Sequence, residues 1–235
     1  LWVRDLPDGK PRRLTRQEEH FEAYPAWSRD GRNIVYVTWH DQELGSLRVV
    51  SSRGGNGKVL NATPGHFVEP AFSPDGSTVV FRRIKGGFIR SPLWSEVTGV
   101  FAVSVKGGEE RLVSKDGYEP HFGADNDRVY IMRPAKDRKR ELVSMTLDGK
   151  DEIVHAISDF ATDVKVSPDG KWLAFQERFN AWITPLAASG KPITIGPDMK
   201  SLPVARASDN TGNWLHWSGD SDRLYWAEGP VLYQR

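Results

Sequence analysis

Short apolar runs recur along the chain, and a polar turn comes before each of them. The runs are rich in β-branched and aromatic residues and occupy residues 34–37, 79–81, 129–131, 173–175 and 224–226. Continuous apolar runs this short, bounded by turn residues, are typical of strands that are buried on both faces. The pattern therefore predicts an all-β chain in which these strands lie in the middle of packed sheets.

The turns share one motif, whose clearest copy is Ser73-Pro74-Asp75-Gly76. Proline presets φ for the first turn position, serine and aspartate oxygens accept backbone N–H bonds, and glycine takes a positive φ without penalty. The aspartate of the motif stands at positions 30, 75, 125, 169 and 220, at intervals of 45, 50, 44 and 51 residues. Intervals of this size are typical of four-stranded propeller blades.

We predict a β-propeller of four-stranded antiparallel blades, with about five blades represented in a single domain over 1–235. The predicted blades are 1–15 (partial), 23–63, 67–114, 118–156, 161–206 and 212–235 (partial). A propeller closes to hide its sheet edges, so two leading strands and three trailing ones indicate a piece of a larger propeller of six or more blades. The residues expected at equivalent buried positions are Trp27, Phe72, Phe122, Val166 and Trp217.

The motif at 69–76 and the closing segment at 107–113 resemble the WD-repeat-like blades of the TolB and tricorn-protease group of propellers. Three less generic segments, 37–47, 177–181 and 214–220, are similar to the propeller region that precedes the catalytic domain of bacterial amidohydrolase-like proteins. The resemblance implies a module for protein interaction or assembly beside a metal-dependent amidohydrolase domain in the parent protein. It also implies a bacterial, periplasmic or secreted protein.

Composition removes several function classes. The chain has 32 Lys and Arg against 31 Asp and Glu, a net charge of +1, which favours neither nucleic acid nor an anionic membrane. No apolar run approaches the roughly 18 residues that indicate a membrane span. The absence of cysteine excludes disulfides and thiolate metal sites. We therefore expect a protein partner or an adjacent domain as the binding partner.

Motifs for catalysis are missing from the sequence. Its six histidines form no H-x-H or H-E-x-x-H pattern, and there is neither a G-x-S-x-G elbow nor a P-loop. Amidohydrolase barrels hold their metals with an H-x-H pair and further histidines and aspartates, so this segment lacks that machinery. We expect no catalytic residue and no resident cofactor or metal ligand here.

One set of positions is a candidate ligand site. The residues expected just before each first strand are Tyr24, Glu69, Glu119, Asp163 and Trp214, and the second strands end with residues that include Arg83 and Arg133. If the first strands run alike, three acids gather at the mouth of the propeller channel. The candidate ligand-binding residues are Glu69, Glu119, Asp163, Arg83, Arg133 and His40.

Two interpretations of this set remain open. In the favoured one, Glu69 pairs with Arg83 and Glu119 with Arg133, and the pairs set strand register and solubility. In the other, the carboxylates hold a divalent cation in the central channel. A metal bound by His40, Asp41 and His66 is a less favoured variant.

Two function classes follow. The first is a non-catalytic module that docks a protein partner or screens a neighbouring catalytic domain. The second is a propeller enzyme or ligand-binding protein that acts on a small molecule of the sugar or lactone class with a cation in its channel. The positions equivalent to the channel set are chemically heterogeneous, and this favours the first class. Contact loops are expected in the insertion at 84–94, and a solvated hairpin tip at 136–140.

Overall fold

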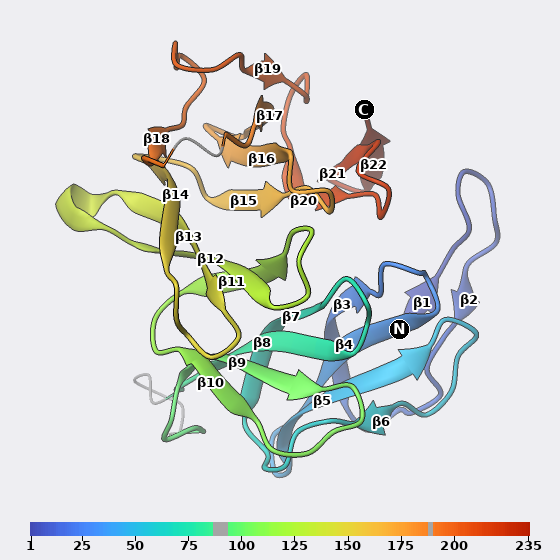
Figure 1. The fold of residues 1–235 in the computed structure, drawn as a ribbon. Helices are drawn as coiled ribbons and strands as arrows, with labels where there is room; N and C mark the ends of the chain where they lie inside the picture. Colours follow the sequence, from blue (N-terminus) through green and yellow to red (C-terminus); the bar gives the residue numbers. More distant parts are fainter. Residues whose placement is uncertain (87–93, 188–189) are drawn as a thin grey trace. The chain divides into compact units, whose positions relative to one another are not determined.

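The computed structural model describes residues 1–86, 94–187 and 190–235, so most of the insertion at 84–94 lies outside the described residues (Figure 1). The chain divides into two compact units, Leu1–Asp116 and Gly117–Arg235. Within the described ranges, strands are the regular structure apart from one 3-10 turn, Lys136–Arg138, at the exposed hairpin tip. The prediction of an all-β chain is confirmed.

The first unit holds a two-stranded ribbon and two complete antiparallel blades, in which consecutive strands are neighbours. The ribbon consists of β1 (Trp2–Val3) and β2 (Arg12–Arg13). The first blade consists of β3 (Phe21–Trp27), β4 (Asn33–His40), β5 (Leu44–Ser51) and β6 (Lys58–Val59). The second consists of β7 (His66–Phe72), β8 (Thr78–Ile84), β9 (Gly99–Ser104) and β10 (Arg111–Ser114).

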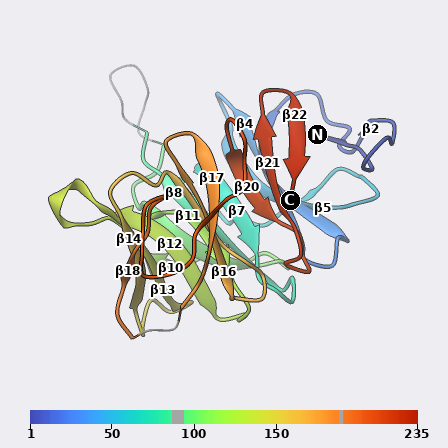
Figure 2. The same cartoon turned by 90° about the horizontal axis from the view of Figure 1, so that it is seen from above.

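The second unit holds two complete blades and a three-stranded sheet, drawn in red in Figure 2. The third blade consists of β11 (Tyr118–Phe122), β12 (Arg128–Pro134), β13 (Arg140–Thr146) and β14 (Ile153–Ser158). The fourth consists of β15 (Asp163–Val166), β16 (Trp172–Glu177), β17 (Asn180–Pro185) and β19 (Ala205–Arg206). The last sheet consists of β20 (Asn213–Trp217), β21 (Leu224–Glu228) and β22 (Val231–Gln234).

One strand departs from the simple blade order. After β17 the chain forms β18 (Ile193–Thr194), which pairs in parallel with β14 of the third blade before the chain returns as β19. The segment carries Ile195, which is 4% exposed and belongs to the apolar core shared by the third and fourth blades. Burial of this side chain explains why the segment adds a fifth strand to the third blade.

The turn motif has the structure that its residues predict. In the fourth blade Ser167 Oγ donates to Asp169 Oδ1 at 2.5 Å, while Asp169 Oδ1 accepts from the backbone N–H of Lys171 at 3.1 Å. The same Ser–Asp contact occurs in three other blades, at Ser28, Ser73 and Ser218. Gly170 has φ of 73°, and the equivalent glycines also have positive φ. These turns join the first and second strands.

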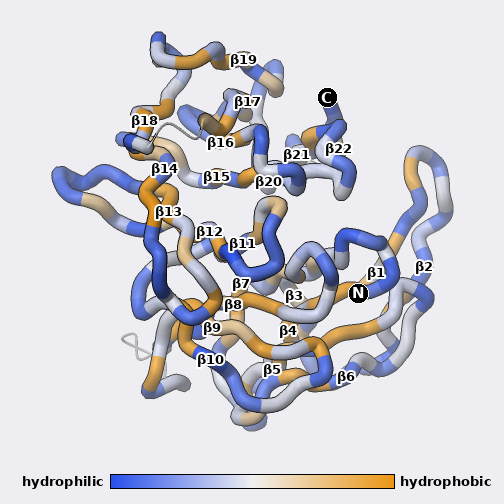
Figure 3. The backbone as a smooth tube through the Cα atoms, viewed as in Figure 1, coloured by the Kyte–Doolittle hydropathy of each residue, from blue (hydrophilic) through white to orange (hydrophobic). Residues whose placement is uncertain are grey.

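The core lies between neighbouring blades, where apolar strands face each other (Figure 3). Phe72, Val166 and Trp217 are 8%, 3% and 8% exposed, and each packs among residues of the blade before it. Phe122 is 7% exposed. Trp27 is 43% exposed, which contradicts the prediction that it is buried. Among the described residues, the core cluster that the β1–β2 ribbon shares with this blade contains Ile34, Tyr36 and Val50 but not Trp27.

A β-bulge interrupts the first strand in four of the five blades. The register of β7 shifts between Val68 and Ala71, and those of β3, β11 and β20 shift at the equivalent place. The bulged residues have φ between 52° and 56°, a conformation that non-glycine residues rarely adopt. They are Tyr24, Glu69, Glu119 and Trp214. The prediction placed these residues before the strands, whereas the structure places them within the strands.

Candidate functional site

Polar side chains follow one face of the first strands in the second unit. On β15, Val164 and Val166 are buried while Asp163 and Lys165 are half-buried, as the alternation of a strand requires. The equivalent strand β11 presents Glu119 and His121, and β20 presents Trp214 and His216. Two of these residues, Glu119 and Asp163, belong to the predicted ligand set. Lys165, His121 and His216 each stand two positions after a residue of the predicted set before the first strands. The period of a strand was the signal that could have found them.

Lys165 is held between two carboxylates. Its Nζ donates to Glu119 Oε2 at 3.0 Å and lies 3.2 Å from Asp163 Oδ1, and the three side chains are 25%, 23% and 14% exposed. Asp163 also accepts, through Oδ2, the backbone N–H of Leu215 at 2.9 Å. Burial lowers the pKa of Lys165, but Asp163 and Glu119 outweigh burial and the net pKa is raised. Lys165 is therefore a fixed cation that joins β15 to β11, and its partner Asp163 joins β15 to β20.

His121 is engaged through both ring nitrogens. Nε2 accepts the backbone N–H of Val166 at 3.0 Å, so Nδ1 carries the proton and donates to the backbone oxygen of Glu119 at 2.9 Å. Burial and the charge of Lys165 lower the pKa of His121 to about 3. His121 is thus neutral, with neither nitrogen available as a base. Burial and Lys165 also lower the pKa of His216.

The predicted arginine pairs are not formed. Glu69 Oε1 accepts from Arg82 Nη1 at 3.1 Å, whereas Arg83 pairs with Glu110 and lies 4.6 Å from the ring centre of Phe101. The bulge explains the exchange, because it turns Glu69 toward the same face of the sheet as Arg82.

Arg133 also has partners other than the predicted one. Its Nε donates to Glu141 Oε1 at 2.6 Å and its Nη2 donates to Glu152 Oε1 at 2.6 Å. Glu141 lies directly opposite Arg133 on the neighbouring strand β13. Glu119 pairs instead with Lys165. Of the predicted ligand set, Glu119 and Asp163 meet at Lys165, whereas Glu69, Arg83 and Arg133 have other ion-pair partners.

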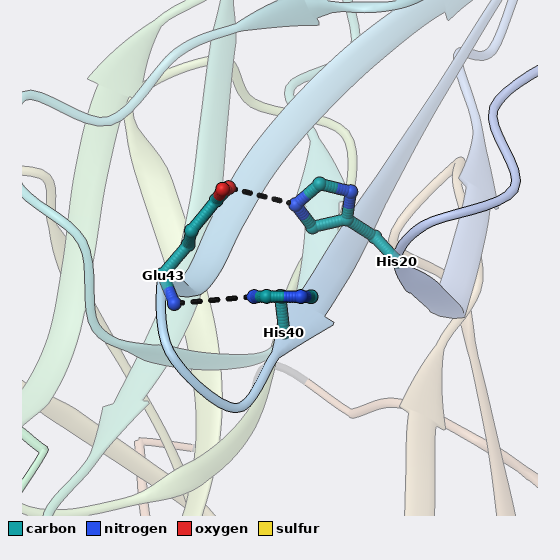
Figure 4. Close-up of side chains that lie close together, drawn as sticks. All are labelled: His20, His40 and Glu43. Carbon is teal, nitrogen blue, oxygen red and sulfur yellow. Dashed lines mark hydrogen bonds and ion pairs between the residues drawn. The ribbon is translucent and has the colours of Figure 1, made fainter.

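His40 has different neighbours from those the sequence suggested. His20 and Glu43 lie beside it in the first unit (Figure 4). Asp41 accepts from Trp39 Nε1 at 2.9 Å, and the ring of His66 lies 4.8 Å from that of Trp39. Because His40 and Trp39 are successive residues of one strand, their side chains point to opposite faces.

A cavity of about 560 Å³ lies at the end of β16 in the second unit. Glu177 lines it and is 5% exposed; burial, assisted by Asp159 and Asp198, raises the pKa of Glu177 although Arg178 opposes this. Arg178 and Phe179 form the tight turn that follows, with φ of 49° and 74°. Such turns favour glycine or asparagine, so the Arg178–Phe179 backbone is strained. No sequence pattern indicated this cavity.

Comparisons with known proteins agree with the fold. No family model matches the chain. The chain is 24% identical over 181 residues to an uncharacterised peptidase, YuxL, of Bacillus subtilis, and 32% identical over 94 residues to the Tol-Pal system protein TolB of Francisella tularensis. It covers 24% of the peptidase and 19% of TolB, so it spans about a quarter or less of these curated relatives.

Solved structures match nearly the whole chain. The crystal structure of TolB from Acinetobacter baumannii superposes with a TM-score of 0.70 over 99% of this chain and 55% of that one, at 15% identity. The fold is a TolB-type β-propeller. The crystal structure of an oligogalacturonate lyase from Vibrio parahaemolyticus also superposes, with a TM-score of 0.67 over 99% of this chain and 70% of that one, at 11% identity.

The resemblance to amidohydrolase-linked propellers stays a prediction. Within the described ranges, the structure contains no helix of the length and apolar character needed to cross a membrane.

Proposed function

We propose that this chain is a non-catalytic β-propeller module that docks a protein partner or a neighbouring domain of its parent protein. The observation that carries the proposal is the mutual engagement of the polar side chains on the first strands of the second unit. Lys165 is neutralised by Glu119 and Asp163, and both nitrogens of His121 bond to the backbone. These residues join blades to one another, and none of the four is poised to transfer a proton.

The neighbouring domain in this proposal is a hydrolase. The segments that resemble amidohydrolase-linked propellers support a metal-dependent amidohydrolase, and the match to part of a protein named as a peptidase supports a hydrolase more broadly. A propeller beside an active site acts by admitting some substrates and excluding others. A periplasmic or secreted location is part of the same proposal and follows from the sequence resemblance.

Two measurements test the proposal. The purified chain, with and without divalent metals, is expected to turn over no amide, ester, lactone or oligosaccharide substrate. A photo-crosslinking residue at Trp214, which is 76% exposed on a first strand, should capture one defined partner or the neighbouring domain in the parent protein. The same residue at Ile153, 47% exposed on the outer strand β14, serves as the control. Turnover that disappears in Glu119→Gln or Asp163→Asn would overturn the proposal.

A second candidate is a propeller that binds a small sugar or lactone together with a cation. It is favoured by the approach of Glu119 and Asp163 to one point, and by the solved structure of an oligogalacturonate lyase in complex with manganese, which has a TM-score of 0.64 and 11% identity. Electron paramagnetic resonance of Mn²⁺ added to the chain separates the candidates. Mn²⁺ binding that is lost in Glu119→Gln supports the second, and a Mn²⁺ signal that does not differ between the wild type and Glu119→Gln supports the first.

A further inference from the structure

Three potential metal ligands meet at one end of the first blade, in the first unit. His20 precedes β3, His40 ends β4, and Glu43 lies in the turn between β4 and β5 (Figure 4). One ligand atom from each lies within 4.8 Å of the others. Across the described ranges, this is the one group of three histidine or carboxylate side chains with that geometry.

Neighbouring residues contact both histidines. The side chain of Gln17 bonds to His20 twice, accepting its backbone N–H and donating to its carbonyl oxygen, both at 2.8 Å. His40 pairs with Leu44 across the turn, and the backbone N–H of Glu43 donates to His40 Nδ1 at 3.3 Å. The two imidazole rings lie 5.1 Å apart. Gln17 thus fixes the backbone of His20, while the N–H of Glu43 occupies Nδ1 of His40. A metal bound by Nε2 of His40 requires the tautomer with the proton on Nδ1, and binding therefore replaces this long contact.

The donor set selects the kind of metal. Two imidazoles and one carboxylate are the ligands of three-residue zinc sites, whereas Ca²⁺ and Mg²⁺ take oxygen ligands. Ligand atoms about 2.0–2.1 Å from a tetrahedral zinc lie roughly 3.3–3.5 Å apart, so the group must close slightly. The Glu43 side chain is 68% exposed and already has Oε2 at 3.0 Å from His20 Nε2. Rotation of this exposed carboxylate can bring it closer to His40, and rotation of the two imidazole rings, which lie 5.1 Å apart, supplies the rest of the closure.

We propose that His20, His40 and Glu43 form a Zn²⁺ site with one open coordination position. The chain contains no cysteine that would compete for zinc. A cavity of about 280 Å³ adjoins the site and is lined by His20, Glu43 and Arg48. The fourth ligand is therefore water or a donor atom of a bound molecule, and the guanidinium of Arg48 favours an anionic group there. This site goes beyond the docking function proposed above.

Calorimetric titration of the purified full chain with ZnCl₂ near neutral pH tests the site. We expect one equivalent of zinc, no binding of Ca²⁺, and a Tm that rises with zinc. X-ray absorption should show a nitrogen and oxygen shell with the scattering of two imidazoles. His20→Ala and His40→Ala should each weaken binding by more than about 100-fold, since loss of mere supporting residues costs about 10–100-fold. Glu43→Gln should weaken it as well.

The controls use a histidine and an acid outside the site. His155→Ala, on β14 of the second unit, and Glu18→Gln, an exposed acid that pairs with Arg13, should leave zinc binding unchanged. Circular dichroism of each zinc-free variant checks that it folds. If a variant at His20 fails to fold, X-ray absorption of the zinc-bound wild-type chain still gives the number of imidazole ligands. Absence of zinc binding, or equal loss in His155→Ala and His20→Ala, would overturn the proposal.

Discussion

The Nζ of Lys165 on β15 lies 3.0 Å from Oε2 of Glu119 on β11, so one ion pair joins the first strands of two neighbouring blades. The residues are 46 positions apart in the sequence, which is about one blade. The third and fourth blades share an apolar core, and the ion pair adds a polar contact between their first strands. A contact of this kind fixes how one blade meets the next.

Replacement of this lysine tests its structural role. Lys165→Met should lower the free energy of unfolding by about 1–3 kcal/mol, less than the 3–5 kcal/mol of a fully buried pair, because the side chain is 25% exposed. The control Lys171→Met, at a side chain that is 77% exposed, should change stability by less than about 0.5 kcal/mol. Urea unfolding measures both. Equal losses of unfolding free energy in the two variants would show that the ion pairs of Lys165 do not stabilise the fold.

The same variant has a predictable pH dependence. The pKa of Lys165 is raised because the two carboxylates outweigh burial, so its stabilising contribution is fully present below the unfolded pKa of about 10.4. That contribution is lost as pH rises through the higher folded pKa. The stability difference between wild type and Lys165→Met should therefore be constant at neutral pH and shrink only above about pH 10. A difference that shrinks near pH 7 would show that the lysine is unpaired.

The bulged residues predict an unusual preference for glycine. Trp214 has φ of 54° and is 76% exposed, so Trp214→Gly should be more stable than Trp214→Ala by about 1 kcal/mol. Asp163 is the equivalent residue in the blade whose register is continuous, and there Asp163→Ala should be the more stable by about 0.5–1 kcal/mol. Thermal unfolding of the four variants measures both differences. If the glycine variant were the more stable at both positions, or the alanine variant at both, the result would contradict a bulge at Trp214.

The packing of blades predicts unequal losses at two aromatic residues. Phe72→Ala should cost about 3–5 kcal/mol, as is usual for a buried aromatic side chain. Trp27→Ala should cost less than about 2 kcal/mol in this chain, because the indole is 43% exposed. Denaturant unfolding compares them. A loss below about 1 kcal/mol for Phe72→Ala would show that its position in the core is wrong.

The turn motif predicts part of the acid sensitivity. Burial raises the pKa of Asp169, but bonds from Ser167 and the backbone N–H of Lys171 outweigh it and the net pKa is lowered. A lowered folded pKa gives stability that is present above the unfolded value and lost as pH falls. Asp169→Asn should therefore show a shallower loss of stability below about pH 4 than wild type. Glu109→Gln, at an exposed acid, should leave the acid limb unchanged.

The sequence alone determined the blades, because a blade is specified by neighbours along the chain. Ser73, Asp75 and Gly76 form their turn through contacts that span at most five residues. The short apolar run that follows the turn is rich in β-branched and aromatic residues, and this composition favours a strand. The approximate bounds of the blades and the buried positions of Phe72 and Trp217 follow from this local information. These features needed no knowledge of which blade meets which.

Tertiary structure decided the polar contacts. Glu69 pairs with Arg82 rather than Arg83 because the bulge adds one residue to β7 and so changes the face of the sheet to which Glu69 points. No local sequence pattern indicates this bulge. His20 and Glu43 lie 23 residues apart and meet because the β3–β4–β5 sheet returns the chain to the same end. A side chain's face is set by its own strand, whereas its partner is set by the twist and register of another. The partner of a side chain is therefore determined only when the sheets have packed.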